Sequence, residues 1–481
     1  MTSSRRILKY TGIFMIMELG TRIMDAAVSV VLARYLAPQG YGLLAFALSF
    51  SSLFSILPGF GMGSLSTRDV SRDRTQLNRY VVNGFLAKIP LSLATVAMMA
   101  GAAWFWHFPG PKCQAIGLAA VLMLFEANLT YALSFFQAVQ RVASVARINL
   151  TVRLGWVLGS LAVIAMHGGI AHLLAIRAVI TGLGLLATVL ILHFRIETIR
   201  WEVDTAFIVR FLKASFPFLL FKLYGTLYMD IDTVMLSVMR GDVMTGWYAS
   251  AQKFLRVLTF VPNSFCAAML PVISSASKDQ RGEVVVSITR SCKYLLLIGL
   301  PIAGAVCSMA DPIIRLLYGP NYQGAVPALQ ILVWAVPFSF LNGAMIVAVA
   351  AVGREKTGSV CLIFGALFSS LSNLLVIPLF GHLGAASTTV TAETCIFFLQ
   401  LRVLKQELPM LRLWPAMRGI IAASAGMSVF AWLIRKAPLA VAAPMTVVTY
   451  ACLLVAVRAL EPEDWQMLTG LLKRRAETKP S

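Results

Sequence analysis

Long apolar stretches recur along the whole chain, and short segments rich in charged residues, proline or glycine separate them. Each stretch is roughly 20 residues long, the length at which an α-helix crosses a hydrocarbon core about 30 Å thick. A single buried core would not repeat such stretches so often. The pattern therefore predicts an all-α integral membrane protein with about 14 transmembrane helices. The predicted spans are 12–33, 42–65, 80–106, 115–136, 148–166, 171–194, 214–238, 246–275, 294–310, 325–352, 357–380, 384–404, 416–434 and 438–457.

These spans predict two lobes of six helices, followed by two further helices and a tail. The connections between spans are short, so we expect no soluble catalytic domain between them. The predicted domains are an N-lobe at 1–200, a C-lobe at 201–408, a helix pair at 409–460 and a basic cytoplasmic tail at 461–481.

The second helices of the two lobes have related sequences. A shift of 204 residues places Gly42 on Gly246 and Pro58 on Pro262. Because six is an even number, both lobes would have the same orientation, and an axis along the membrane normal would relate them. Parallel repeats of this kind occur in secondary transporters, whose substrate site lies between the lobes.

The charge balance on its own suggests a different class of protein. The net charge is +20, which in a soluble protein would indicate a nucleic-acid partner. With the N-terminus inside, however, 28 of the 41 Lys and Arg residues fall in cytoplasmic segments and six in the opposite loops. Cytoplasmic loops of membrane proteins collect positive charge in this way. We therefore expect both termini in the cytoplasm and no nucleic-acid partner.

Some charged residues fall inside the predicted helices. Each costs about 2.5–3.5 kcal/mol at the bilayer centre, so most must pair with one another or line a water-filled cavity. The cations are Arg22, Lys88, Arg153, Arg177, Lys222, Lys253 and Arg256, and the acids are Glu18, Asp25, Glu126, Asp230, Asp232 and Glu393.

Depth in the membrane separates these cations. Arg22 and Arg256 fall near the middle of their helices, so we expect them to line a cavity, with a structural ion pair as the alternative. Arg153 and Arg177 fall within about two turns of a helix end, where we expect snorkelling to the interface.

The spacing of the charges adds two hypotheses. Glu18, Arg22 and Asp25 form one stripe of the first helix, where Asp25 either neutralises Arg22 or carries a coupling proton. Lys253 and Arg256 share a face that has no acid one turn away, which favours an anionic ligand.

Two acids of the preceding helix have open roles. Asp230 is a possible partner of that basic face, and Asp232 could be interfacial.

The predicted site is a cationic cleft with no catalytic residue and no metal. Cysteines and histidines show no metal-ligand spacing. The predicted substrate-binding residues are Arg22, Arg256, Lys222, Lys88 and Lys253; Asp25, Glu18, Asp230 and Glu393 are predicted for ion coupling or charge pairing; Pro262 is a possible hinge.

Two loop motifs resemble a known family. Residues 32–42 read LARYLAPQGYG, and residues 317–322 read LYGPNY, followed by ALQIL at 328–332 and AVGR at 351–354. Together they resemble polysaccharide flippases of the Wzx type, a branch of the multidrug/oligosaccharidyl-lipid/polysaccharide (MOP) exporter superfamily.

The resemblance implies a V-shaped fold of two lobes in the bacterial inner membrane, working by alternating access. The implied substrate is an oligosaccharide on an undecaprenyl pyrophosphate carrier, moved from the cytoplasmic to the periplasmic leaflet. No cofactor is implied beyond a proton or Na⁺ as coupling ion, and the chain has no phosphate-binding loop of ATPases. A polysaccharide polymerase and the chain-length machinery are the implied partners.

Three alternatives stay open. Flippases of the peptidoglycan lipid precursor resemble this chain in placing Arg and Asp on the first helix and Arg on the eighth, at Arg22, Asp25 and Arg256. A drug exporter of the superfamily would have an acidic core. A membrane polymerase or ligase would need a large outer loop or grouped catalytic side chains.

Overall fold

The described residues are helical and include no strand, which confirms the predicted all-α membrane class. Within the described ranges, nine helices are long and apolar enough to cross a membrane, or up to ten with one bent pair. The number 14 stays a prediction, and the tail at 461–481 lies outside the described residues. The computed structural model describes residues 3–196, 198–259, 261–262, 265 and 281–459, with the backbone alone at 3–19, 221, 281 and 283.

The chain divides into two compact units. Unit 1 comprises Met1–Val257 and Ala366–Thr388, and unit 2 comprises Leu258–Gly365 and Thr389–Ser481. The lobe boundaries proposed at residues 200 and 408 stay a prediction.

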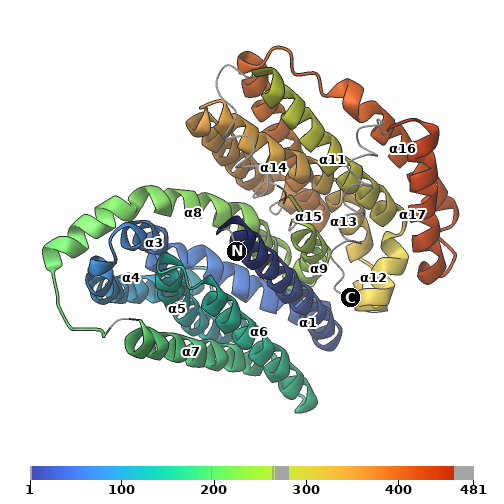
Figure 1. Cartoon of the computed structure of the whole chain (residues 1–481). Helices are drawn as coiled ribbons and strands as arrows, with labels where there is room; N and C mark the ends of the chain where they lie inside the picture. The colour runs from blue at the N-terminus through green and yellow to red at the C-terminus, as the bar shows by residue number, and fades with distance from the viewer. Residues whose placement is uncertain (1–2, 197, 260, 263–264, 266–280, 460–481) are drawn as a thin grey trace, which may run out of the picture. The chain divides into compact units, whose positions relative to one another are not determined.

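Unit 1 holds the first nine helices of the chain, drawn from blue to green in Figure 1. Helix α5 packs against α7, and α1 contacts α5, α6 and α8. The helices are α1 (Ser3–Phe54), α2 (Ile56–Gly59), α3 (Met62–Arg72), α4 (Leu77–Phe105), α5 (Gly110–Ala138), α6 (Val142–Ala165), α7 (Ile170–Arg195), α8 (Thr205–Arg240) and α9 (Asp242–Leu258).

Unit 2 is centred on α11, which contacts α14 and α16 (Figure 1). The long α15 contributes residues to both units. The helices are α11 (Arg281–Ser308), α12 (Ala310–Tyr318), α13 (Ala325–Leu332), α14 (Ala335–Ala351), α15 (Glu355–Glu407), α16 (Trp414–Leu433) and α17 (Leu439–Ala456).

The loop expected between spans 12–33 and 42–65 is a one-residue break inside α1. Ala37 has φ 53° and ψ 175°, and helix resumes at Pro38. A residue before proline avoids the helical region, while proline itself suits the first turn of a helix. The same local chemistry thus ends one helix and begins the next.

Two predicted spans contain breaks in the helix. Span 42–65 breaks at Ser55, where the helices on either side are bent by 41°. A second break lies at Gly61. Gly61 has φ 69°, and a Cβ there would lie 2.5 Å from the Cβ of Phe218, so only glycine fits. Residues Ala325–Ala351 are long and apolar enough to cross a membrane as one span, in agreement with the predicted 325–352. A short turn separates α13 from α14 within it, because Pro337 in the first turn of α14 has no N–H for a preceding carbonyl.

Two glycines bring α1 and α9 into backbone contact. A Cβ built on Gly42 would lie 1.7 Å from the carbonyl oxygen of Asp242, and one on Gly246 would lie 2.0 Å from that of Pro38. Both pairs of equivalent positions are 204 residues apart, so the contact is reciprocal, as the predicted repeat requires. No side chain fits between the two helices here.

A buried ion pair lies beside this contact. Lys112, at the start of α5, is only 6% exposed, although the sequence placed it in a loop. Its ammonium donates to Ser237 Oγ at 2.6 Å and to Asp242 Oδ1 at 2.9 Å. It also lies 4.1 Å from the ring centre of Phe46. The α5, α8 and α9 ends are therefore tied together where α1 meets α9.

The connection from α7 to α8 runs along the start of α4. Asn78 exchanges two hydrogen bonds with the backbone of Arg200, at 2.9 and 3.0 Å. Asn83 bonds the backbone of Glu202 and Asp204 in the same manner. Asp204 caps α8, and the Phe207 N–H together with the Arg79 guanidinium holds the pKa of its carboxyl below the usual range. The start of α8 is thereby fixed to α4.

We expect Gly42→Ala to destabilise the protein by about 1–3 kcal/mol, the usual effect of overpacking. The methyl group would overlap a backbone carbonyl that no side-chain rotation can move away. Thermal unfolding of the detergent-purified protein measures the change.

The matched control is Gly20→Ala on the same helix, because nothing lies within 4 Å of a Cβ there. Equal unfolding temperatures for the two variants would show that the reciprocal contact does not limit stability.

Candidate functional site

Three adjoining cavities lie within unit 1, and their walls come from both halves of the sequence. The two larger ones have volumes of about 540 and 440 Å³ and share Asp25, Glu126 and Lys253 among their lining residues. A smaller one of about 340 Å³ shares Lys222 with the second.

The cavities are strongly cationic. All seven cations that the sequence places inside the predicted helices line at least one of them, from α1, α4, α6, α7, α8 and α9. Among the described lining residues, the acids are Asp25, Glu126 and Asp230. Basic side chains therefore outnumber acidic ones by seven to three, in a space that water can reach.

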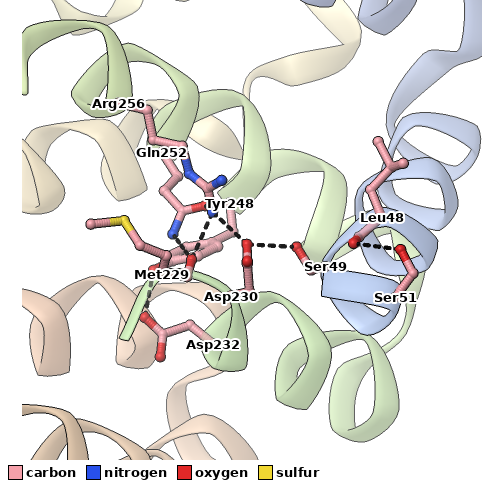
Figure 2. Close-up of polar contacts among 9 residues, drawn as sticks. All are labelled: Leu48, Ser49, Ser51, Met229, Asp230, Asp232, Tyr248, Gln252 and Arg256. Carbon is pink, nitrogen blue, oxygen red and sulfur yellow. Dashed lines mark hydrogen bonds and ion pairs between the residues drawn. The ribbon is translucent and has the colours of Figure 1, made fainter. Parts of the chain in front are cut away.

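Arg256 of α9 contacts several groups, and Figure 2 shows its guanidinium beside Met229 and Asp230 of α8. Its Nη2 lies 2.7 Å from the Met229 carbonyl, 2.9 Å from Asp230 Oδ1 and 3.0 Å from Gln252 Oε1. Ser49 of α1 also donates to Asp230 Oδ1. The predicted Asp230–Arg256 pairing is thus present, and 39% of the Arg256 side chain stays exposed.

Arg22 and Asp25, from one stripe of α1, reach different partners. Arg22 donates to the backbone carbonyl of Arg256 at 3.4 Å, so the two arginines predicted from depth are adjacent. The carboxylate of Asp25 forms an ion pair with Arg153 of α6 at 2.8 Å.

Arg153 and Arg177 do not snorkel, contrary to the expectation from their depth. Both line the two larger cavities, and Arg177 pairs with Glu126 at 2.9 Å. The Arg177 guanidinium also lies 5.3 Å from the ring centre of Trp156. Their partners, Asp25 on α1 and Glu126 on α5, lie on other helices, so the position of each arginine along its own helix does not reveal them.

The three lysines of the predicted site differ from the arginines. No carboxylate of the described part of the chain lies within ion-pair distance of Lys88, Lys222 or Lys253. Lys253 lines the two larger cavities, and Lys222 joins the second to the smallest. In this they differ from Arg153, Arg177 and Arg256, each of which has a carboxylate partner.

Asp232 is buried inside the protein, with 3% of its surface exposed, and its depth in the membrane stays a prediction. Tyr248 donates to its Oδ2 at 2.9 Å, and Asn373 of α15 donates to its Oδ1 at 2.6 Å. Thr388 in turn donates to Asn373 Oδ1. No sequence pattern indicated this group, because Asn373 and Thr388 of α15 lie more than 100 residues from Asp232 and Tyr248 along the chain.

The other predicted residues lie elsewhere. Glu393 belongs to unit 2, where it accepts a hydrogen bond from Asn342 at 2.6 Å, and it does not line the cavities of unit 1. Pro262 is helical and buried, and its hinge role stays a prediction. Only the backbone of Glu18 is described, so its side-chain role lies outside the described residues.

The sequence also matches two family models. The first, described as "Polysaccharide biosynthesis protein", covers residues 7–277, more than half of the chain. The chain belongs to the polysaccharide biosynthesis protein family. The second model, MatE, covers residues 217–375. Both matches confirm the resemblance to MOP-superfamily flippases that the motifs at 32–42 and 317–322 indicated.

Two curated relatives match part of this family member. A putative O-antigen transporter of Escherichia coli K12 is 27% identical over 184 residues, covering 38% of this chain and 44% of the relative. An uncharacterized membrane protein of Methanocaldococcus jannaschii is 27% identical over 180 residues, covering 37% and 36%. The chain thus spans less than half the length of the curated relatives it matches.

Solved structures show that the family member has the fold of MOP transporters. The lipid II flippase MurJ, in an inward closed conformation, superposes with a TM-score of 0.75 at 15% identity, covering 93% of this chain and 99% of that one. An inward-facing multidrug resistance MATE transporter gives a TM-score of 0.63 at 14% identity, with coverages of 84% and 96%. The family, this fold and the long apolar helices together show a multi-pass membrane protein.

We expect the Asp25–Arg153 pair to show a coupling energy of about 1–3 kcal/mol in a double-mutant cycle. Asp25→Asn, Arg153→Gln and the double variant would be compared by unfolding in lipid nanodiscs. Each single change leaves a charge in a cavity that is screened less than a surface.

The exposed pair Asp311–Arg315 in unit 2 is the matched control, with side chains 48% and 58% exposed. Its cycle should give less than about 0.5 kcal/mol. Coupling of the same size in both cycles would mean that the cavity behaves electrostatically like open surface.

Proposed function

We propose that this transporter flips oligosaccharides linked to undecaprenyl pyrophosphate from the cytoplasmic to the periplasmic leaflet of the bacterial inner membrane. It does so by alternating access, driven by an ion gradient, with both termini in the cytoplasm. The single observation behind this proposal is the excess of basic over acidic side chains in the unit 1 cavities.

A diphosphate is the anionic part common to such lipids, and it fits the chemistry of this site. Guanidinium groups donate paired hydrogen bonds to phosphate oxygens, and these bonds are stronger where water is partly excluded. Arg22, Arg153, Arg177 and Arg256 all line one cavity with Lys253. The described acids neutralise part of that charge and hold the arginine side chains in position.

The same charge balance disfavours a drug exporter. Organic cations would be repelled by a cavity lined by seven cations and three described acids. The fold shared with a lipid II flippase does not separate polysaccharide carriers from peptidoglycan precursors, since both carry a diphosphate. Substrate rescue in cells therefore distinguishes them.

We further propose Asp232 as the coupling-ion site. Ionisable groups buried in transmembrane helices mark ion pathways by default. The carboxylate oxygens are of the kind that protons and hard cations bind, and the Tyr248 hydroxyl and the Asn373 amide now donate to them. Asp25 and Asp230, by contrast, already neutralise arginines.

Export by Arg256→Gln should fall at least tenfold in a strain that lacks its own polysaccharide flippase, at matched membrane levels. The change removes a guanidinium that forms an ion pair with Asp230 and lines the cavity. Surface polysaccharide and lipid-linked repeat unit retained inside the cell are the two readouts.

Arg315→Gln, an exposed arginine in unit 2, should export like wild type. Wild-type activity of Arg256→Gln would exclude this arginine from the site. Failure of the wild-type chain to restore polysaccharide, together with rescue of peptidoglycan precursor export, would assign it the other lipid diphosphate.

Asp232→Asn should abolish stimulation of export by an imposed proton or Na⁺ gradient in proteoliposomes. The amide keeps the size of the side chain but cannot hold the charge that attracts the ion. Binding of the lipid-linked glycan should stay within about threefold of wild type, since Asp232 does not line the cavities described above.

The control for charge alone is Asp311→Asn at the surface of unit 2. Gradient stimulation that survives Asp232→Asn would place the coupling ion elsewhere.

A further inference from the structure

The smallest cavity differs in chemistry from the two larger ones. It has a volume of about 340 Å³ and is lined by Lys88 and Lys222, with no acid among its described lining residues. Hydroxyl and amide groups of Ser64, Thr67 and Asn149 make up part of its wall. The larger cavities instead balance each of three arginines with a carboxylate.

Lys88 is held inside the protein in a defined position. It is 2% exposed, and its ammonium donates to the Ala127 carbonyl at 2.7 Å. The same nitrogen lies 5.0 Å from the ring centre of Tyr131. One hydrogen bond leaves two of the three N–H donors of the ammonium for a ligand. A buried cation without an acid is costly unless an anion completes its surroundings.

Lys222 reaches the same cavity from α8, and its ammonium lies directly against Gly59. A Cβ built on Gly59 would lie 2.5 Å from the Lys222 ammonium nitrogen. Lys222 also lines the larger neighbouring cavity, so the two cavities adjoin at this side chain. The two lysines therefore lie next to the arginine-lined space.

We propose that the Lys88–Lys222 pocket is a separate subsite for an acidic group on the glycan itself, such as the carboxylate of a uronic acid. The inference rests on the proposed function and names its substrate class: lipid-diphosphate oligosaccharides that carry a further negative charge. The diphosphate occupies the arginine-lined cavities, and the lysine pair selects among glycans. Two point charges among neutral hydroxyl and amide groups suit a carboxylate on a sugar ring.

Two matched probes test this assignment on the full chain in nanodiscs. Both are short-chain polyprenyl diphosphate disaccharides, one ending in glucose and the other in glucuronic acid, so that they differ by one carboxylate. The wild-type protein should bind the uronate probe roughly 10- to 100-fold more tightly, the range of a charge-assisted contact out of bulk water.

Lys222→Met should reduce that preference to about threefold or less, because the uronate probe should lose more affinity than the glucose probe. Gly59→Ala should act in the same direction without removing a charge, because its methyl displaces the ammonium. The matched control is Gly225→Ala on α8, where nothing lies within 4 Å of a Cβ. Arg256→Gln should weaken both probes by the same factor.

The outcomes separate this inference from the function on which it rests. Equal wild-type affinities for the two probes, or equal weakening of both by Lys222→Met, would overturn the acidic-glycan subsite and leave the flippase proposal standing. Equal weakening would mean that the lysines grip the diphosphate. Absence of wild-type binding to either probe would overturn the proposed function and the subsite together.

Discussion

A cation cannot stay in hydrocarbon without a partner or water, and this constraint organises unit 1. Six helices each direct basic side chains into the same connected space rather than toward lipid. Carboxylates on α1, α5 and α8 meet three of the arginines there, so the ion pairs also bind helices to one another. The same charged side chains therefore do two things: they make the cavities polar, and their ion pairs fix the helices that form the cavity walls.

Glycine determines where that space ends and how far it reaches. Gly42 and Gly246 allow two backbones to touch, and Gly59 leaves room for an ammonium group that a methyl would displace. The first pair excludes side chains and water from between α1 and α9, whereas the single glycine extends the polar space toward α4. The shape of the cavities therefore depends on these glycines as well as on the arginines that line them.

Hydropathy alone predicted the helical class and located seven cations inside helices, of which five were assigned to a cleft. Breaks within spans were missed where proline or a positive φ interrupts an apolar run, as at Gly61 and Pro337. Partners across helices were mostly out of reach: depth along one helix predicted that Arg153 and Arg177 leave the interior, because Asp25 and Glu126 are distant in sequence. The contact between Asp232 and Asn373 was not predicted for the same reason, since the two residues are 141 positions apart.

The burial of Lys112 has a consequence for biogenesis. Its partner Asp242 is 130 residues further along the chain. At a synthesis rate of about 5–20 residues per second, α5 enters the membrane roughly 6–26 s before that carboxylate exists. In the interval the ammonium must stay in water at the membrane edge. The native position of α5 can therefore form only after α8 and α9 have inserted. This helix thus reaches its final packing late, although it is synthesised early.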